Sequence, residues 1–350
     1  MPSDLGFAIV GVGMIADFHA RALMEVKGAK LVAAYSRSRE KTAAFASKYN
    51  LWAAPSFEAL LARKDVDIVC VTTPSGSHAE VAVPALKAGK HVFCEKPLDI
   101  QLDRIDAMLK AAKKNKRLLT AIFQSRFGQG AKTLKKAVTE GRFGKLTLCD
   151  AYIKWWRTQE YYDSGAWRGT WDLDGGGAMM NQGIHAIDLL QWLVGMPSEV
   201  FAHTATLAHS RIQVEDTAVI ALKYPHGALG VIEGATSAWP GFLKRIEVSG
   251  EKGSAILEDD RLIFWKFDKE TPEDEAIRAR ALQTSSIGGG ASDPKAISTE
   301  GHRVQMQDMV DAIRENRPPT IPGEEGRKAV QLILAIYKSA RTGRKVAVSG

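Results

Sequence analysis

The stretch AIVGVGMIADFHARAL, residues 8–23, constrains the fold most, because an apolar run meets a glycine-rich turn and then a helical pattern. Gly11, Gly13 and Ala16 have the spacing G-x-G-x-x-G/A. In such a unit the first glycine permits a tight turn, the second lets the backbone approach a pyrophosphate, and the third position allows close helix–strand packing. The helix N-terminus then stabilises the phosphate charge. A tight strand–helix turn without a ligand is the alternative.

The residues that follow this turn in the sequence favour the ligand-binding interpretation. Short, nearly continuous apolar runs alternate with helical patterns, which is typical of parallel strands covered on both faces. We therefore predict an α/β fold, with a doubly wound Rossmann domain over residues 1–125 that binds NAD(P). The predicted strands are 6–10, 30–35, 67–72, 91–94 and 118–123, and the predicted helices lie near 14–27, 38–49, 56–63, 77–89 and 101–116.

A different pattern follows, and it predicts a second domain over residues 126–350. Strand-like segments joined by short turns such as PHG and GEKG indicate a mostly antiparallel sheet in an α+β domain. The polar segment 268–298 reads as an excursion loop or a partly disordered region. The final two helices could pack back on the first domain. The predicted strands are 147–156, 199–209, 216–224, 228–238, 245–250 and 254–266, with helices near 178–194, 302–315 and 323–341.

Composition narrows the class of protein. A chain of 350 residues is long enough for two domains, and its longest apolar runs fall short of the roughly 18 to 20 residues of a membrane span. No basic leader precedes the first strand, so no signal peptide is expected. Cys70, Cys94 and Cys149 are isolated in apolar segments, which predicts buried free thiols in a reducing cytoplasm and no metal site.

The chain is basic, with a formal net charge of +7 and a pI near 9.2. Its basic residues are scattered along amphipathic helices such as 108–117, without a nucleic-acid-binding signature. Solvated helix faces account for this pattern. A second interpretation is that the positive field favours an anionic cofactor or substrate.

The end of the second strand bears on the choice between NAD and NADP. An acid at this position usually bonds the adenosine ribose of NAD, but the chain has Ser36, Arg37 and Ser38. Hydroxyls around a guanidinium suit a 2′-phosphate, which favours NADP(H) over NAD(H). The alternative is that Ser36 or Ser38 caps the following helix.

Other cofactor contacts are expected beyond the carboxyl ends of the strands, where open parallel sheets bind ligands. The segment VTTPSGSH, residues 71–78, follows one strand and should lie along the cofactor, although Ser77 could serve only as a helix N-cap. The predicted set, besides the two glycines and residues 36–38, is Met14, Ile15, Thr73, Pro74, His78, Glu95, Lys96 and Gln124.

Taken together, several motifs show a family resemblance. The glycine turn, VTTPSGSH, CEKP at 94–97, GGGAMMNQGIHAIDLL at 175–190 and the C-terminal PPTIPGEEGRKAVQLILAIYKSA resemble the Gfo/Idh/MocA family over essentially the whole chain. The resemblance implies a Rossmann domain followed by an open-faced, mostly antiparallel sheet that often mediates oligomer contacts. It also implies an NAD(P)-dependent dehydrogenase or reductase of sugars, polyols or related compounds.

The family's Glu-Lys-Pro motif corresponds to Glu95, Lys96 and Pro97, and its lysine lies near the nicotinamide. Position alone agrees, since Lys96 follows a strand on the ligand side of the sheet and Pro97 favours an extended backbone before it. A partly desolvated lysine beside a cationic ring has a lowered pKa and can act as an acid or base. A strand-end salt bridge or an exposed pair is the alternative.

The second family signature corresponds to Asn181 through His185, followed by Asp188. Positions 181 and 185 lie one turn apart on a helix, and the glycines 175–177 should let its N-terminus approach a ligand. Many members carry aspartate where this chain has Asn181, so a carboxylate at position 181 is not expected to support the histidine here. We predict that His185 shares the catalytic work, the alternative being a core histidine on an apolar helix.

The segment 154–177, KWWRTQEYYDSGAWRGTWDLDGGG, supplies aromatic and cationic side chains suited to a sugar. A packed sheet-domain edge explains the tryptophans equally well. This segment and Asn181 look similar to the branch that oxidises the 3-hydroxyl of UDP-N-acetylglucosaminuronate. The predicted substrate-binding residues, besides Lys96 and His185, are Arg157, Tyr161, Trp167, Arg168 and Asn181.

We therefore predict a cytoplasmic oxidoreductase that moves a hydride between nicotinamide and a hydroxyl-bearing carbon of a sugar or nucleotide sugar. Nucleic acid, membrane and metal are not expected as partners. An open-faced sheet needs a cover, which predicts a homo-oligomer, a dimer or a tetramer. Two alternatives are a non-catalytic NAD(P)-binding sensor and a glycosidase that uses bound NAD on the same fold.

Overall fold

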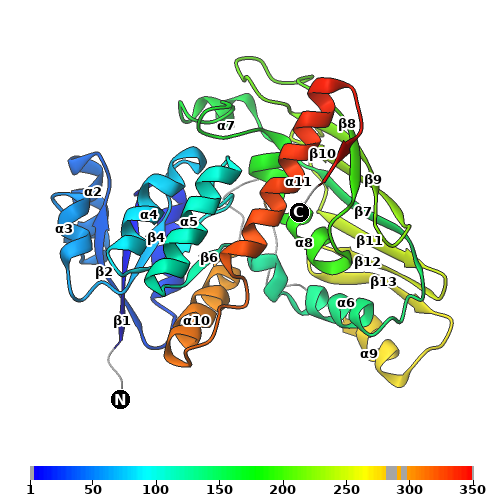
Figure 1. Ribbon diagram of the computed structural model, residues 1–350, viewed down its shortest axis with the longest axis horizontal. Helices are drawn as coiled ribbons and strands as arrows, with labels where there is room; N and C mark the ends of the chain where they lie inside the picture. Colours follow the sequence, from blue (N-terminus) through cyan, green and yellow to red (C-terminus); the bar gives the residue numbers. More distant parts are fainter. Residues whose placement is uncertain (1–3, 281–289, 293–297, 349–350) are drawn as a thin grey trace. The chain divides into compact units, whose positions relative to one another are not determined.

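The computed structural model describes residues 4–280, 290–292 and 298–348. Contacts divide the chain into two compact units, the first formed by residues 1–124 and 299–327 and the second by residues 125–298 and 328–350. The segment 299–327 therefore belongs to the same unit as the first 124 residues of the chain. Each unit has its own sheet and its own helices (Figure 1).

The first unit contains a six-stranded parallel sheet in the order β3-β2-β1-β4-β5-β6. This is the strand order of a dinucleotide-binding Rossmann fold, so the predicted fold class is confirmed. Sequence analysis missed β3, which has only two residues and pairs with β2. The strands are β1 (Leu5–Val10), β2 (Ala29–Tyr35), β3 (Trp52–Ala53), β4 (Ile68–Val71), β5 (His91–Cys94) and β6 (Leu119–Ala121).

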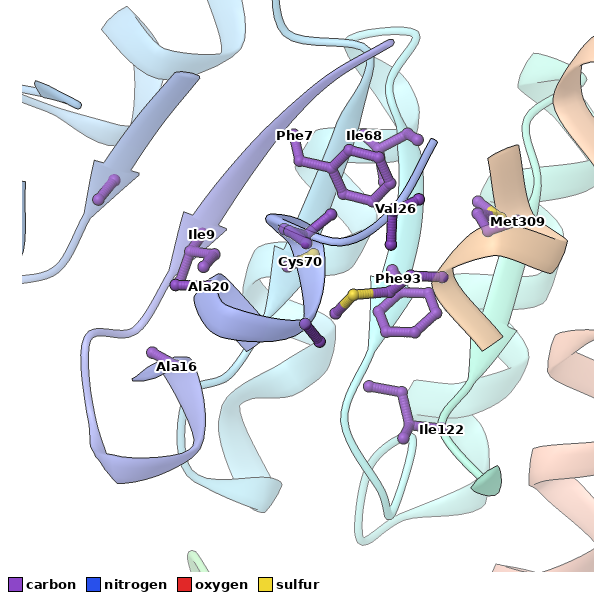
Figure 2. Close-up of a cluster of buried hydrophobic side chains, with 14 of the residues drawn as sticks. Phe7, Ile9, Ala16, Ala20, Val26, Ile68, Cys70, Phe93, Ile122 and Met309 are labelled. Atoms are coloured by element: carbon purple, nitrogen blue, oxygen red, sulfur yellow. The ribbon is translucent and has the colours of Figure 1, made fainter. Parts of the chain in front are cut away.

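The helices of the first unit include one from the returning segment. Figure 2 shows side chains of β1, β4, β5 and α1 gathered in one apolar cluster together with Met309, which α10 contributes. Burial of this cluster attaches the segment 299–327 to the unit. The helices are α1 (Met14–Leu23), α2 (Arg39–Tyr49), α3 (Phe57–Ala62), α4 (His78–Lys87), α5 (Leu102–Asn115) and α10 (Glu300–Arg314).

The second unit contains an eight-stranded sheet in the order β13-β12-β11-β7-β10-β9-β8-β14. All neighbours are antiparallel except β7 and β10, as predicted for a mostly antiparallel sheet. Buried and exposed residues alternate along β9, as expected of a sheet with one covered face. The strands are β7 (Leu146–Lys154), β8 (Glu199–Ala205), β9 (Thr217–Lys223), β10 (Leu229–Ala235), β11 (Arg245–Gly250), β12 (Gly253–Glu258), β13 (Arg261–Phe267) and β14 (Val346–Ala347).

Two sequence predictions for the second unit are wrong in detail. The single strand predicted over 254–266 is a hairpin, because the chain reverses at Asp259, which has a φ of 51°. Residues predicted as an excursion loop include helix α9 (Pro272–Arg280), whose acidic first turn and basic last turn complement the helix dipole. Residues 281–289 and 293–297 of that excursion lie outside the described residues.

The remaining helices of the second unit are α6 (Gln129–Thr139), α7 (Gln159–Asp163), α8 (Ile184–Val194) and most of α11 (Gly323–Thr342). A π-helical turn, Ala178–Gly183, leads directly into α8 where a continuous α-helix was predicted. Within the described ranges, no helix is long and apolar enough to cross a bilayer. The three cysteines are buried and free.

Candidate active site

The glycine turn between β1 and α1 has the backbone that its sequence predicts. Gly11 has a φ of 99°, and a Cβ there would lie 2.7 Å from the backbone of Thr72. Thr72 Oγ1 donates a hydrogen bond of 2.6 Å to the Gly11 carbonyl, which fixes the turn against the end of β4. Only glycine fits this position.

The space before α1 is suited to a dinucleotide. A Cβ on Gly13 would meet no described heavy atom within 4 Å, so the backbone is open to a close approach by phosphate. Met14 and Ile15 begin the helix there, and Met14 is exposed. Among the described residues, the buried polar atoms Thr73 Oγ1 and Gln124 Oε1 have no hydrogen-bond partner. Buried polar atoms of this kind normally find one, and a bound cofactor can supply it.

The cluster at the end of β2 is partly occupied by the chain itself. Ser38 caps α2, because its Oγ accepts a hydrogen bond of 3.3 Å from the Lys41 amide. Ser36 Oγ donates to the Ser38 carbonyl at 3.0 Å. Arg37 is exposed and makes no hydrogen bond or ion pair within the described part of the chain. The capping alternative therefore applies to Ser38, and the phosphate-binding prediction now depends on Arg37.

Lys96 follows β5 at the carboxyl edge of the parallel sheet and is partly buried. Its neighbour Glu95 is buried, and the Glu95 carboxylate faces His19. Burial alone would raise the pKa of Glu95, but hydrogen bonds from histidines outweigh this effect and hold its pKa well below the ordinary value. Glu95 is therefore an anion, and Lys96 leaves the strand next to a fixed negative charge.

His78 connects the two loops that carry most of the predicted cofactor contacts. Its Nδ1 lies 2.7 Å from the Pro97 carbonyl oxygen and its Nε2 lies 2.9 Å from the Thr73 carbonyl oxygen. Burial lowers the pKa of His78, although these hydrogen bonds oppose the effect. Both ring nitrogens face backbone carbonyls, so the geometry gives His78 a part in shaping the site. Pro74 precedes the short turn that leads to His78.

In the second unit, the π-helical turn presents Asn181 and Gln182 as neighbours. Asn181 Nδ2 donates to the buried carboxylate of Asp174, and Gln182 Nε2 donates to Asn181 Oδ1 at 3.0 Å. Asp174 also accepts from the Gly169 amide at 2.8 Å. The chain thus places a carboxylate against the side chain of Asn181. His185 lies in the first turn of α8 and is partly buried.

A cation that binds a sugar is expected to be accessible to solvent, but Arg157 is buried. It is 2% exposed, and its guanidinium donates to the carbonyls of Trp156, Gly290 and Ala291. It also donates to Gln182 Oε1 at 2.8 Å. Arg157 therefore holds Gln182 in place, and its effect on a substrate would pass through that amide.

Arg168, Tyr161 and Trp167 form a partly exposed aromatic and cationic group. The guanidinium carbon of Arg168 lies 4.3 Å from the centre of the Tyr161 ring and 4.6 Å from that of Trp167. Arg168 also donates to Tyr161 Oη at 2.6 Å, and Gln182 Nε2 donates to the same oxygen at 2.8 Å. Within the described ranges, Arg168 has no carboxylate partner. We call these three residues the Arg168 group.

Two further residues shape this region and were missed by the sequence analysis. Glu215 accepts hydrogen bonds from the amides of Gly177 and Met179 at 3.1 and 2.8 Å, and from Tyr337 Oη at 2.8 Å. Burial raises the pKa of Glu215, against the effect of these donors. In the sequence, the adjacent acids Glu215 and Asp216 stand out just before β9, but no pattern links them to the glycines 175–177.

The contacts of Glu215 change the interpretation of the glycines. A Cβ on Gly177 would lie 1.9 Å from the Glu215 carbonyl oxygen, and one on Gly176 would lie 2.0 Å from Tyr337 Oη. The described chain itself therefore requires glycine at both positions. The Glu215 backbone beside Gly177 and the Tyr337 side chain beside Gly176 are sufficient reason for these two glycines, and the approach of the helix N-terminus to a ligand stays a prediction.

Arg126 is the other missed residue. It forms two hydrogen bonds with Asp188, of 2.8 and 2.6 Å, and both side chains are buried. Asp188 lies on α8 one turn after His185, so this ion pair fixes the helix that carries the predicted histidine. A lone arginine 62 residues away in the chain gives no sequence signal for such a pair.

The glycine turn and the strand order define a dinucleotide-binding Rossmann domain. The oxidoreductase family with an NAD-binding Rossmann fold matches residues 5–123, and the GFO/IDH/MocA C-terminal domain matches residues 131–256. The chain belongs to the Gfo/Idh/MocA family.

Relatives and solved structures agree with this assignment. The chain is 28% identical to the myo-inositol 2-dehydrogenase of Thermotoga maritima, over 97% of each chain. It is 33% identical to the WlbA dehydrogenase from Bordetella pertussis, solved with NADH and UDP-GlcNAcA, with a TM-score of 0.91 over 100% of this chain and 99% of that one. The WlbA dehydrogenase from Chromobacterium violaceum, solved with the same two ligands, is 34% identical, with a TM-score of 0.89 over 99% and 96%.

These matches show an enzyme, an NAD-binding oxidoreductase that acts on sugar-like substrates. They do not favour the alternative of a non-catalytic sensor, because the relatives are named dehydrogenases. The individual roles of the predicted site residues stay predictions.

Proposed function

We propose that this enzyme oxidises the 3-hydroxyl of a nucleotide-linked N-acetylhexosaminuronate such as UDP-N-acetylglucosaminuronate. The Arg168 group carries this proposal, because it offers a guanidinium without a carboxylate partner in the described chain, packed on two aromatic rings. A substrate carboxylate would complete this site with charge-assisted hydrogen bonds, and the aromatic rings suit the C–H surface of a sugar. The similarity to two WlbA dehydrogenases over the whole chain supports the same substrate class.

The residues of the two units have different roles in the proposed reaction. In the first, Gly11, Gly13, Thr73 and Gln124 hold the dinucleotide, and Lys96 exchanges the proton of the reacting hydroxyl. The bound nicotinamide supplies the hydride acceptor or donor. Lys96 suits the proton transfer because it is partly buried at the carboxyl edge of the parallel sheet.

In the second unit, the hydrogen-bond network around Tyr161 prepares polar groups for a sugar. Tyr161 Oη accepts from both Arg168 and Gln182, so its own proton is available to a substrate oxygen. Asn181 and His185 are assigned to the hydroxyls near the reacting carbon. His185 orients the reacting hydroxyl or shares the proton work, and Asp174 fixes the amide of Asn181.

Replacing Arg168 with methionine should weaken use of the uronate while sparing its neutral analogue. We expect kcat/KM for UDP-N-acetylglucosaminuronate to fall by roughly 10- to 150-fold, the value of a lost hydrogen bond between charged groups. UDP-N-acetylglucosamine lacks the carboxylate, so its weaker turnover should change little. Steady-state rates with both substrates measure the difference.

The matched control for this experiment is Arg211→Met. Arg211 forms an exposed ion pair with Asp163 on the surface of the same unit, and we expect its loss to leave both rates unchanged. Equal losses for the two substrates in Arg168→Met would contradict a carboxylate contact. Faster turnover of myo-inositol than of any uronate by the wild-type enzyme would favour a polyol dehydrogenase, the activity named for the 28% identical relatives.

For the cofactor, we propose that Arg37 contacts the adenosine 2′ position and that NADP(H) binds at least as tightly as NAD(H). Arg37→Ala should weaken NADP(H) by roughly tenfold, the lower end for a charged hydrogen bond because the side chain is exposed. NAD(H) affinity should stay the same and serves as the internal control. Fluorescence titration of both reduced cofactors measures the two effects. A strong wild-type preference for NAD(H) would contradict the proposal, and the NADH complexes of similar structures make this comparison necessary.

A further inference from the structure

Three buried side chains from distant parts of the first unit meet behind Lys96. His19 lies on α1, Glu95 directly follows β5, and His302 lies on the returning helix α10. His19 Nε2 lies 2.9 Å from Glu95 Oε1, and His302 Nε2 lies 3.6 Å from the same oxygen. The other oxygen, Glu95 Oε2, accepts a hydrogen bond of 3.1 Å from the Lys96 amide. We call His19, Glu95 and His302 the Glu95 triad.

The helix that brings His302 is itself fixed to the sheet. Gln305, one turn further along α10, donates to the Ala121 carbonyl at 2.7 Å and accepts from the Phe123 amide at 3.1 Å. Met306 and Met309 of the same helix belong to the apolar cluster drawn in Figure 2, in which Met309 is labelled. The packing and hydrogen bonds of α10 therefore fix the position of His302 near Glu95.

The donor set of the triad resembles a metal site, because its ligand atoms all lie within 4.8 Å of one another. The hydrogen-bonding of the two histidine rings, however, does not fit metal binding. A metal on Nε2 would force each proton onto Nδ1, and in the described chain the buried Nδ1 atoms of His19 and His302 have no partner. Metal-bound histidines almost always donate that proton to an acceptor. If both rings instead carry the proton on Nε2, each directs a donor at the Glu95 anion, and Nδ1 is left as an acceptor.

The residues that follow Lys96 in the chain are also fixed by hydrogen bonds. The Pro97 carbonyl lies 2.7 Å from His78 Nδ1, and Asp99 accepts from the amides of Ala79 and Ile100 at 3.0 and 2.8 Å. Lys96 is thus flanked by two residues whose polar groups are bonded to buried side chains. Its own side chain is partly exposed between these fixed points.

From this arrangement we propose that His19 and His302 are positioning residues for Lys96. They fix the Glu95 carboxylate, which in turn fixes the Lys96 amide, so that the lysine leaves the strand in one direction. This inference rests on the proposed function of Lys96 in proton transfer. It assigns a role in catalysis to residues on α1 and α10 that make their contact through Glu95.

A double-mutant cycle between His19 and Lys96 tests the proposal. His19→Met removes the donor at similar volume, and His19→Gln restores an N–H group near the position of Nε2. We expect His19→Met to slow single-turnover hydride transfer roughly 10- to 100-fold, since small displacements of a catalytic group have effects of this size. His19→Gln should recover most of the rate. In the Lys96→Met background, His19→Met should cost less than about twofold, because its effect passes through Lys96.

The outcomes separate positioning from stability and from failure of the proposed function. Equal fold losses in both backgrounds, or a wild-type rate in folded His19→Met, would overturn the positioning role while leaving the function intact. If His19→Met does not accumulate as folded protein, the double-mutant cycle is measured with His302→Met in its place. The same result is then required, a loss of less than about twofold in the Lys96→Met background. Stoichiometric metal in the purified wild-type enzyme, measured by elemental mass spectrometry, would also overturn it. A wild-type enzyme that transfers no hydride from any sugar tested would remove the proposed function, and the positioning role with it.

Discussion

Lys96→Met should slow the chemical step by roughly 10²- to 10⁴-fold, the usual contribution of a positioned proton-transfer group. Methionine keeps much of the side-chain length but cannot exchange a proton. The glycine turn, Thr73 and Gln124 are unchanged, so dinucleotide affinity should stay close to that of the wild type. Single-turnover kinetics with enzyme in excess over UDP-N-acetylglucosaminuronate isolates this step from product release.

Lys87→Met is the matched control, because Lys87 is an exposed lysine in the last turn of α4 in the same unit. Its hydride-transfer rate should equal that of the wild type. His185→Ala should lose less activity than Lys96→Met, since position 181 is asparagine where many family members carry aspartate. Near-normal rates in Lys96→Met would show that the lysine is structural. Lost dinucleotide binding would show that it mainly holds the cofactor.

Arg126→Met should destabilise the protein by about 3–5 kcal/mol, the cost of leaving one partner of a buried ion pair uncompensated. Both Arg126 and Asp188 are buried, and both hydrogen bonds between them would be lost, leaving a buried carboxylate without its guanidinium. Urea unfolding followed by circular dichroism measures the change. Because Asp188 lies on α8, the loss should also reduce activity through His185.

Two variants make this stability test specific. Arg211→Met removes an exposed ion pair of the same unit and should change the unfolding midpoint little. The double variant Arg126→Met/Asp188→Leu removes both charges and should recover much of the lost stability. If Arg126→Met unfolds at the wild-type urea concentration, the buried pair does not stabilise this helix.

The sequence predicted the fold where local patterns determine it. Continuous apolar strands and the glycine turn are sufficient for the parallel sheet, and Gly11 has the positive φ that its motif requires. The hairpin of β12 and β13 was missed because its strands are separated only by Asp259 and Asp260, without a glycine or proline. Two-residue strands such as β3 contain too little pattern to be recognised.

The site was predictable only in part, because its supporting contacts join residues far apart in the chain. Lys96 and Arg168 could be selected from motifs, whereas the pairing of Glu95 with His302 depends on the return of α10 to the first unit. The hydrogen bond from Asn181 to Asp174 depends on a π-helical turn that periodicity does not reveal. The burial of Arg157 against Gly290 could not be predicted either, because the sequence near Arg157 gives no sign of that contact.

The most direct test of the central claim is the fate of the hydrogen on the oxidised carbon. Wild-type enzyme should be mixed with oxidised dinucleotide and UDP-N-acetylglucosaminuronate that carries deuterium at C3, and the cofactor analysed by mass spectrometry after one turnover. The proposed reaction predicts deuterium in the reduced nicotinamide, formed more slowly than with unlabelled substrate. Reduced cofactor without deuterium, or no reduction with this substrate, would contradict it.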